Sequence, residues 1–599
     1  MANHSGPESC SRPREGAVEA LTGETDRSAI EPRNQESGMP TLLSEAEGDT
    51  EHGANCKSCD DPARSETLYM SGSLSRGSWE VSSVSAVVVA DGAGKAKSRN
   101  PVVNADEKSD TPIVPEKLPN KGVSPAEVME GRGVAKGNTN EPPTPRTLSR
   151  VKCVSMGLEG VRQAARKDKR MQFTALLHHV TPSLLVESFE ALRKQAAAGV
   201  DGVTWEEYEK ILGVRVPELH REIHSGAYRA QPSRRVFIPK ADGKLRPLGI
   251  AALEDKIVQQ AVTTVLNAIY EEDFLGFSYG FRKGRGQHDA LDALSTGILR
   301  RRINWILDAD IRAFFDEIDH SWMSKFLEHR IADQRILRLI RKWLKAGAIE
   351  DGKRIAAERG TPQGAVISPL LANIYLHYVF DLWAHQWRSR EAEGDVIVIR
   401  YADDTVMGFE HEFEAKRFLR DMEQRFAQFG LRLHPDKTRL IRFGRNAIQH
   451  RRAQGLRKPE TFDFLGFTHL CGQTRKGHFK IERLTIKKRM RATLASIREA
   501  LMRRRHAPIA ATGRWLGRVV RGYFNYYAVP GGNIYRLDGF RKEVCRAWRF
   551  SLMRRSQRHR MTWSRFDRLV NLFLPKVRVL HPYPNERFDA KTQGRSRMQ

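Results

Sequence analysis

The sequence predicts an α+β fold, in which short apolar strands carry acidic residues at their ends and helices pack around them. Two apolar runs, 396–399 and 406–409, flank a short turn. A third apolar run, 305–311, leads into a carboxylate upstream. Apolar residues also follow a glycine-containing loop after Ser368, and they recur at helical spacing between 490 and 501. The first pattern is typical of paired strands and the second of helices.

The turn between the first two apolar runs carries adjacent carboxylates, in the order Tyr401-Ala402-Asp403-Asp404. This pattern predicts a strand, a tight turn and a second strand. Like charges held rigidly beside buried strands are unfavourable unless a cation compensates them, and hard oxygen ligands at this density suit Mg²⁺. Alone, the four residues are equally compatible with a turn whose charges are solvated. A third acidic group is therefore needed to decide.

Asp310, at the end of the upstream apolar run, is the candidate for that third group. A carboxylate at a strand end and a pair on a hairpin can meet across a sheet, where two bridged Mg²⁺ ions would stabilise an in-line displacement at phosphorus. Asp310 and Asp319 both also have a structural interpretation, as a strand end and a helix cap. We accept it for Asp319, because residues 320–322 open a helix-like stretch. For Asp310 the accompanying motifs argue otherwise.

A glycine-flanked loop, 360–364, stands between these segments and precedes an apolar helix. Its backbone N–H groups and the Gln363 amide can approach a phosphorylated ligand closely. At this point the order of motifs resembles a known family, the bacterial group II intron-encoded reverse transcriptases and maturases. The match is specific because it is to a series of motifs. In chain order they are 199–204, 237–240 with 243–250, 277–282, the Asp310 segment, 362–364, the 401–404 turn, 430–433 with 437–438, and 462–467.

The resemblance covers residues 165 to 585 and implies a right-hand polymerase fold. We expect an N-terminal extension over 1–160, fingers over 161–300, a palm with an antiparallel sheet over 301–470, a helical thumb or maturase-specific domain over 471–585, and a basic tail over 586–599. The implied activity is RNA-directed DNA synthesis with two Mg²⁺ ions. Its partners would be an RNA template, a DNA primer, deoxynucleoside triphosphates and the parent group II intron RNA, whose splicing it would assist.

The resemblance also implies roles for residues around the palm. Asp310 and Asp403 would bind both metal ions, with Asp404 nearby and the Ile311 carbonyl as a further ligand. Phe315 would lie under the sugar and exclude a 2′-hydroxyl by steric clash. Phe315 is also compatible with a core position beside its aromatic neighbour.

Four further residues resemble nucleotide-binding positions. Lys240 and Arg246 would hold the triphosphate, since a guanidinium suits a forked phosphate contact and an ammonium acts as a point charge. Without the resemblance, they would be assigned to the solvated face of a hairpin, because 241–243 is a turn signal. Gln363 would lie near the template base and the nucleotide. Lys437 matches a position proposed to protonate the leaving pyrophosphate, although an ordinary surface lysine fits equally well.

Basic residues elsewhere are candidates for RNA contacts. We expect Arg282 and Arg285 to follow a nucleic-acid backbone. In the C-terminal region, Arg518 and Arg521 would contact phosphates while Tyr523 or Tyr526 stacks on a base. The aromatic residues there are also compatible with packing between helices.

The net charge is +28 and is unevenly distributed. Residues 1–150 hold 17 Lys and Arg against 23 Asp and Glu, a net −6, whereas residues 481–599 hold 29 against 7, a net +22. Such a basic segment predicts a polyanionic partner, with counterion release from structured RNA adding to affinity. An anionic membrane surface is the competing partner. No apolar run of about 18 residues exists to span a bilayer, and no signal-peptide pattern opens the chain.

The cysteines are few and scattered. Many family members carry a C-terminal endonuclease with paired cysteines, but no cysteine here follows Cys545, so we expect no target-DNA cleavage. Cys56 and Cys59 have a metal-like spacing without a second pair, which favours free thiols. Scattered cysteines suit a reducing bacterial cytoplasm, with nucleoid association during intron mobility.

Residues 1–150 show little hydrophobic periodicity and are predicted not to order themselves. One hypothesis places the true start near Met156 or Met171. Two other functions stay open: a reverse transcriptase serving phage defence or repair, and an RNA-binding splicing cofactor that no longer needs to polymerise. The three intact aspartates argue against the cofactor.

Overall fold

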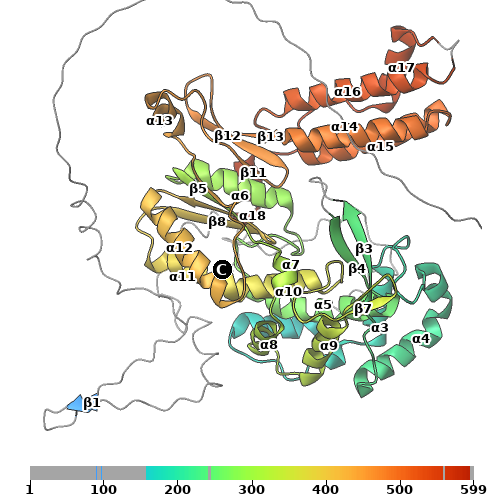
Figure 1. Ribbon diagram of the computed structural model, residues 1–599, viewed down its shortest axis with the longest axis vertical. Helices are drawn as coiled ribbons and strands as arrows, with labels where there is room; N and C mark the ends of the chain where they lie inside the picture. The colour runs from blue at the N-terminus through green and yellow to red at the C-terminus, as the bar shows by residue number, and fades with distance from the viewer. Residues whose placement is uncertain (1–88, 91–95, 98–156, 240–244, 557–559, 594–599) are drawn as a thin grey trace, which may run out of the picture. The chain divides into compact units, whose positions relative to one another are not determined.

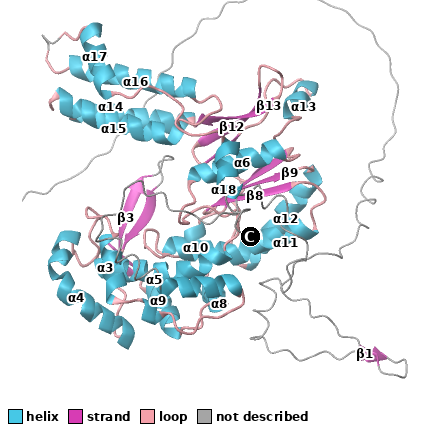
Figure 2. Ribbon diagram, turned by 180° about the vertical axis from the view of Figure 1, so that it is seen from behind, coloured by secondary structure: helices cyan, strands magenta, loops and turns pink. Residues whose placement is uncertain are grey.

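The computed structural model describes residues 89–90, 96–97, 157–239, 245–556 and 560–593, all within the compact unit formed by residues 77–599. These residues form four separate β-sheets among many helices (Figure 1, Figure 2), so the predicted α+β class is confirmed. One sheet is only a pair of short strands, β1 (Val89–Ala90) and β2 (Ala96–Lys97). Every helix in the described part of the chain is too short or too polar to cross a membrane.

The central sheet has four antiparallel strands in the order β10-β5-β9-β8. They are β5 (Trp305–Asp310), β8 (Val396–Tyr401), β9 (Asp404–Phe409) and β10 (Arg439–Arg442). Alternate side chains enter different cores: Leu307 and Met407 belong to one, Ile306 and Val406 to the other. Burial on both faces explains why these strands are near-continuous apolar runs in the sequence.

Helices cover both faces of the central sheet. On one face α6 (Gln287–Arg300) packs against β8, and a Cβ on its Gly297 would lie only 2.9 Å from Ile397 Cδ1. A larger residue at 297 would therefore push the helix away from the sheet. The other face carries a long interrupted helix and its neighbour: α10 (Ser368–Leu376), the π-helical turn η2 (His377–Asp381), α11 (Leu382–Arg390) and α12 (Glu412–Gln428).

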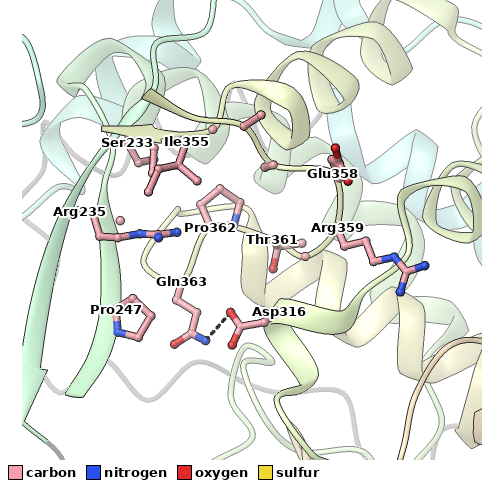
Figure 3. Close-up of a pocket in the computed structure, with 16 residues that line it drawn as sticks. Ser233, Arg235, Pro247, Asp316, Ile355, Glu358, Arg359, Thr361, Pro362 and Gln363 are labelled. Carbon is pink, nitrogen blue, oxygen red and sulfur yellow. Dashed lines mark hydrogen bonds between the residues drawn. The ribbon is translucent and has the colours of Figure 1, made fainter. Parts of the chain in front are cut away.

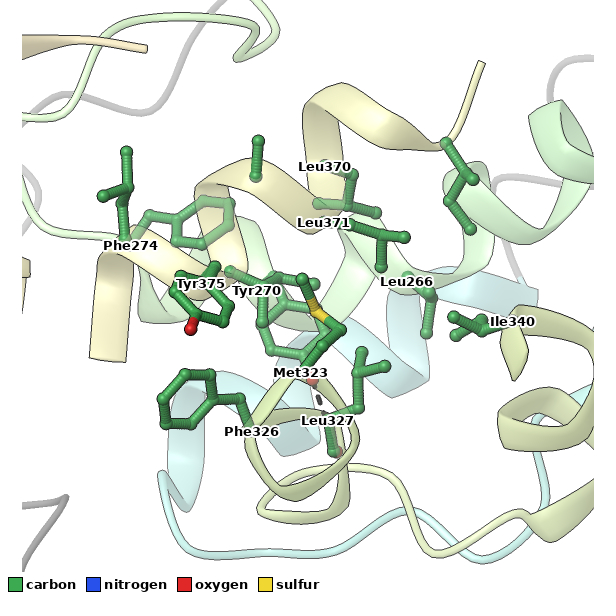
Figure 4. Close-up of a cluster of buried hydrophobic side chains, with 14 of the residues drawn as sticks. Leu266, Tyr270, Phe274, Met323, Phe326, Leu327, Ile340, Leu370, Leu371 and Tyr375 are labelled. Atoms are coloured by element: carbon green, nitrogen blue, oxygen red, sulfur yellow. Dashed lines mark hydrogen bonds between the residues drawn. The ribbon is translucent and has the colours of Figure 1, made fainter. Parts of the chain in front are cut away.

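The larger hydrophobic core forms where a helix that precedes β5 in the chain packs against helices that follow β5. These helices are α5 (Leu253–Asp273), α7 (Phe314–Glu317), α8 (His320–Glu328), α9 (Gln334–Lys345) and α10. Figure 4 shows Tyr270 of α5 beside Tyr375 of α10, and Leu266 of α5 beside Leu371 of α10 and Ile340 of α9. The Tyr375 hydroxyl donates to the Phe429 carbonyl at 2.7 Å. This core fixes the helix that follows the glycine-flanked loop.

A second four-stranded sheet, in the order β4-β3-β6-β7, stands next to this core. Its strands are β3 (Ser233–Pro239), β4 (Leu245–Ile250), β6 (Ala348–Glu350) and β7 (Lys353–Ile355), and the helices η1 (Leu177–His179), α3 (Pro182–Glu190) and α4 (Trp205–Ser225) precede it. Gly249 N–H donates to the Gln363 carbonyl at 2.6 Å, and a Cβ on Gly364 would lie 2.6 Å from the Gly249 carbonyl oxygen. Gly364, with φ 109, can approach that closely because it lacks a side chain.

The C-terminal part combines a small sheet with a helical bundle. Its elements are α13 (Ala447–Ala453), β11 (Phe462–Phe464), β12 (Phe467–Gln473), β13 (Phe479–Thr485), α14 (Lys487–Arg503), α15 (Ile509–Tyr527), α16 (Ile534–Met553), α17 (Trp563–Phe573) and α18 (Pro584–Gln593). Helix α18 packs on α6, and buried Asp292 of α6 pairs with Arg483 at 2.7 Å and Arg587 at 3.2 Å. Helix α6, in the segment expected as fingers, thus packs on the central sheet and on C-terminal elements.

Asp333, the residue directly before α9, connects the N-terminus of α9 to the η1 segment by hydrogen bonds. Its carboxylate accepts the N–H groups of Leu176 and Leu177 at 2.8 and 3.0 Å, and it also pairs with Arg335. Burial alone would raise the Asp333 pKa, but these hydrogen bonds outweigh burial and lower it to about 2. Because the folded pKa lies below the unfolded one, this stabilisation is present above about pH 4 and is lost as the pH falls toward 2.

We expect Asp333→Ala to lower the free energy of unfolding by about 3 kcal/mol at pH 7, because charged hydrogen bonds to buried N–H groups are lost. Urea denaturation followed by circular dichroism measures this. Exposed Asp567 on α17 provides the matched control, and Asp567→Ala should change stability by less than about 0.5 kcal/mol. Equal effects of the two substitutions would contradict the assignment.

Candidate active site

The central sheet brings the predicted acidic residues to one end. Asp310 of β5 pairs in register with Asp404 of β9. Tyr401 pairs with Asp404 across the β8–β9 hairpin, so Ala402 and Asp403 form its two-residue turn. Directly opposed residues of an antiparallel ladder project their side chains to the same face, with Cβ atoms about 4.5–5.5 Å apart. Asp310 and Asp404 are therefore neighbours, and Asp403 adjoins them.

The hairpin turn is strained and is held from outside. Ala402 has φ 58, in the left-handed region that residues with a side chain rarely occupy. Gly280 presses against it, because a Cβ on Gly280 would lie 2.2 Å from Ala402 N. The segment containing Gly280 is hydrogen-bonded to β8 through both backbone groups of Arg400. Tyr279 N–H donates to the Arg400 carbonyl at 2.8 Å, and Arg400 N–H donates to the Phe277 carbonyl at 2.9 Å.

The Arg400 side chain holds the same turn from inside the protein. It is fully buried and forms a two-pronged ion pair with Asp381 of η2, at 2.6 and 2.5 Å. Its remaining N–H groups donate to Asn373 Oδ1 at 3.0 Å, Ser278 Oγ at 2.7 Å and the Ala402 carbonyl at 3.1 Å. All five guanidinium donors are thereby used, which satisfies a charge that would otherwise be costly to bury.

Negative charge at the turn is only partly compensated. Burial raises the pKa of Asp404 to about 7, because the surrounding protein solvates the charge poorly even though the residue reaches the surface. Repulsion from Asp403, Asp310 and Asp308 acts in the same direction. Burial likewise raises the Asp403 pKa, and Asp310 adds to that effect. A cation bound here would relieve both shifts.

Lys437 supplies one positive charge to this site. Its Nζ donates to Asp310 Oδ2 at 2.6 Å. Two backbone contacts hold its segment beside the strand end, because His434 N–H donates to the Asp310 carbonyl at 2.8 Å and Ile311 pairs with Leu433. The predicted basic residue thus lies in direct contact with a predicted metal ligand.

The donor set suits a hard divalent cation. Carboxylate oxygens and a backbone carbonyl are the ligands that Mg²⁺ prefers in proteins. Within the described residues, no three acidic, histidine or cysteine side chains converge closely enough to form a metal cluster. The in-register pairing of Asp310 with Asp404 nevertheless brings two of these carboxylates to the same face of the sheet. Asp310, Asp403, Asp404 and the Ile311 carbonyl therefore fit Mg²⁺ in chemistry and in chain placement.

A cavity of about 340 Å³ lies between the glycine-flanked loop, α7 and strands β3 and β4. Gln363 and Asp316 point toward each other in it (Figure 3), and Gln363 Nε2 donates to Asp316 Oδ1 at 3.1 Å. Phe315, the residue before Asp316, is half-buried and accepts a hydrogen bond from Thr361 N–H at its carbonyl, at 2.8 Å. The loop carrying Gln363 and the turn carrying Phe315 are therefore tied together.

Of the two predicted triphosphate-binding cations, the structure describes Arg246, which lies near the start of β4. Lys240 lies outside the described residues. Arg246, paired with Ile238, is exposed. Although burial is the main influence on the Asp403 pKa, the Arg246 charge lowers that pKa, so this guanidinium acts on the acidic site.

The residues predicted to contact RNA differ in their surroundings. The Arg282 side chain is only 3% exposed, pairs with Glu271 at 3.0 Å and donates to carbonyls of the 275–278 segment. Arg285 is partly buried and donates to a carbonyl of the same segment at 2.6 Å. Both arginines stiffen this loop, and an RNA contact would require their bonds to open.

On α15, Arg518 and Arg521 are exposed, as is Arg514 one turn earlier. Tyr523 is buried instead, and its ring stacks on Phe540 of α16 with centroids 3.8 Å apart. Since the Phe540 ring covers it, Tyr523 packs the two helices together and does not present a free face for base stacking.

Arg400, Asp381 and Asn373 were not among the residues that the sequence indicated. Their signal was present as polar residues inside apolar segments: Arg400 ends the run 396–399, and Asp381 interrupts the apolar stretch 374–384. A charge in a buried segment requires a buried partner. Periodicity alone could not show that these two charges pair with each other.

Comparison with known proteins agrees with the geometry of the site. Residues 238–469 match the family described as reverse transcriptase (RNA-dependent DNA polymerase). Protein YkfC of Escherichia coli strain K12 is 36% identical over 315 residues, which are 46% of this chain and 81% of YkfC. The chain therefore belongs to the reverse transcriptase family.

Other relatives point to group II introns. The group II intron-encoded protein LtrA of Lactococcus lactis subsp. cremoris is 34% identical over 222 residues, which are 37% of this chain and 37% of LtrA. Nuclear intron maturase 3, mitochondrial, of Arabidopsis thaliana is 27% identical over 161 residues, 27% of this chain and 21% of that protein. The chain is thus related to intron-encoded proteins and maturases, although the matches span little more than a third of LtrA.

We expect Asp381→Asn to lower the free energy of unfolding by about 3–5 kcal/mol, because it leaves the Arg400 guanidinium buried without its counter-ion. Equilibrium denaturation measures this. Glu271→Gln is the matched control, since it removes the partner of Arg282 but involves a carboxylate that is 25% exposed, and it should cost less than half as much. An Asp381→Asn protein as stable as the parent would contradict the assignment.

Proposed function

We propose that this protein is an RNA-directed DNA polymerase encoded by a group II intron, and that it also binds the intron RNA to assist splicing and mobility. The observation that carries the proposal is the in-register pairing of Asp310 with Asp404, with Asp403 in the adjoining turn. Membership in the reverse transcriptase family supports the polymerase class. The names of the related intron-encoded protein and maturase support the association with an intron.

Asp310, Asp403, Asp404 and the Ile311 carbonyl are the groups that would hold two Mg²⁺ ions, which when bound activate the primer 3′-hydroxyl and neutralise charge on the leaving group. In the reaction, the primer hydroxyl would give up its proton to solvent, and its oxygen would form a bond to the α-phosphorus of the deoxynucleotide. The bond from that phosphorus to the bridging oxygen breaks, and pyrophosphate leaves. Lys437, hydrogen-bonded to Asp310, would donate a proton to the pyrophosphate.

The remaining residues of the site would position the nucleotide. Lys240 and Arg246 would hold the triphosphate through charge-assisted hydrogen bonds. Phe315 would face the sugar, and its ring would leave no room for a 2′-hydroxyl. Gln363, oriented by its bond to Asp316, would lie beside the templating base. This arrangement would explain why hydrogen bonds join the glycine-flanked loop to α7.

The C-terminal helices would bind the intron RNA. Arg514, Arg518 and Arg521 are exposed on α15, and residues 481–599 carry a net charge of +22. Phosphate contacts by such a face would give affinity that falls steeply with salt. A reverse transcriptase serving defence or repair is the alternative. Folded intron domains in the DNA around the gene favour the intron assignment, and their absence would favour the alternative.

Primer extension on an RNA template with Mg²⁺ tests the polymerase proposal. We expect Asp403→Ala to reduce deoxynucleotide incorporation by a factor of about 10³ or more, because no remaining group can take over its share of the metal binding. Asp567→Ala, far in sequence and exposed on α17, should extend the primer like the parent. Equal incorporation by the parent and Asp403→Ala would remove polymerisation from the account.

The sugar-selecting role of Phe315 makes a separate prediction. Phe315→Ala should raise ribonucleotide use relative to deoxynucleotide use by about 10- to 100-fold, because the ring that excludes the 2′-hydroxyl is gone. Single-nucleotide extension with each substrate gives this ratio. Phe413→Ala, at an exposed position on α12, is the control and should leave the ratio unchanged. An unchanged ratio in Phe315→Ala would assign this residue to packing alone.

A further inference from the structure

A second cavity near the acidic site is lined by arginines that have no role in the proposal above. Its volume is about 330 Å³. The lining residues come from the segment after β5, from α7, from the loop before Gly360, from the last turn of α12 and from the segment after α12: Arg312, Glu317, Arg359, Ala427, Gly430, Leu431 and Arg432. Figure 3 shows the Arg359 side chain extending away from the Gln363–Asp316 pair.

Among the described residues, the arginines of this cavity have only a longer-range carboxylate neighbour, because the Arg359 charge acts on Asp319 without an ion pair. Arg312, Arg359 and Arg432 are exposed, and none forms an ion pair with a carboxylate there. Glu317 is the one acidic group among the lining residues that the structure describes. Three guanidiniums gathered around one hollow create a positive potential that favours an anionic ligand.

The arginines stand on backbone that is firmly held. Arg312 N–H donates to the Arg432 carbonyl at 2.9 Å, so these two residues are paired directly. The loop carrying Arg359 is fixed by Gly360, whose N–H donates to the Ile318 carbonyl at 2.7 Å. The three arginines therefore line the cavity from anchored segments, and a ligand would not have to order the backbone on binding.

The same backbone connects the cavity to the acidic residues. Arg312 lies two positions after Asp310, and His434, two positions after Arg432, donates its N–H to the Asp310 carbonyl at 2.8 Å. Lys437, in the same segment, contacts the Asp310 carboxylate. A ligand in the cavity would thus lie close to the place where the proposed reaction releases its leaving group.

We propose that this cavity binds a phosphoanhydride anion, either inorganic pyrophosphate released by the reaction or the terminal phosphates of a free nucleotide. This inference rests on the proposed function. Forked guanidiniums match the paired oxygens of such a ligand, and several of them together suit its high charge. The cavity is hollowed between α7 and the end of α12, a setting that favours a compact anion over an extended RNA strand.

Direct binding tests the cavity without requiring polymerisation. The full-length protein is titrated with sodium pyrophosphate in EDTA, which removes the divalent ions through which the aspartates would contact it. Binding is followed by isothermal calorimetry and by the rise in Tm. We expect Arg312→Gln, Arg359→Gln and Arg432→Gln each to weaken pyrophosphate binding about tenfold, because each removes charge-assisted hydrogen bonds. Arg420→Gln, at an exposed position on α12 outside the cavity, should bind like the parent.

Separate arms distinguish the ligands. Titration with a deoxynucleoside triphosphate and with pyrophosphate identifies which one loses more affinity in Arg432→Gln, and either result supports the site. If pyrophosphate and triphosphate bind the parent and all three variants equally, the inference is wrong. It is also wrong if only a single-stranded RNA oligonucleotide loses affinity, because the arginines would then contact a nucleic-acid backbone.

The two proposals can fail independently. A parent protein that binds pyrophosphate in EDTA but extends no primer would defeat the polymerase proposal and leave the anion site standing. A parent that extends primers but shows no arginine-dependent binding would defeat the anion site alone. In an active parent, the pyrophosphate concentration that halves primer extension should also rise about tenfold in Arg432→Gln.

Discussion

The buried ion pair between Arg400 and Asp381 is the constraint on which the geometry of the acidic site depends. Both side chains are fully buried, and such a pair is stable only when its hydrogen bonds are complete. Arg400 meets this condition in part because one of its N–H groups donates to the carbonyl of Ala402, the strained residue of the hairpin turn. The same contact that satisfies the guanidinium therefore directs the turn that carries Asp403, and structural stability and site geometry have a common origin.

A rigid turn explains how the protein can keep like charges close together. Repulsion and burial raise the pKa values of Asp403 and Asp404, so the acidic end of the sheet stores unfavourable electrostatic energy. A flexible loop would release that energy by moving apart, whereas the Gly280 backbone and the Arg400 side chain leave this turn little freedom. The arginines that line the second cavity add positive charge, and one of them, Arg312, follows Asp310 by two positions.

The sequence was sufficient for local features and insufficient for long-range ones. The apolar runs and the turn residues between them predicted the β8–β9 hairpin, and the run 305–311 predicted the strand ending at Asp310, because these signals lie within a few residues. The helical part after Ser368 was predicted for the same reason. The Arg400–Asp381 pair, the burial of Arg282 and the packing of Tyr523 on Phe540 depend on partners in other segments. The sequence does not distinguish an exposed arginine from a buried one, so composition alone could not show which arginines are accessible to RNA.

Helix α6 connects the C-terminal elements to the acidic site through continuous packing. Asp292 of α6 holds Arg483 of β13 and Arg587 of α18 in a buried cluster, and the opposite side of α6 contacts β8. Strand β8 carries Arg400 next to its last residue, Tyr401, and leads directly into the hairpin turn. The helices proposed to bind intron RNA and the carboxylates proposed to bind Mg²⁺ therefore share one structural frame. Because close-packed elements move as a unit, RNA bound to the basic helices would be held in a defined position relative to the site of DNA synthesis.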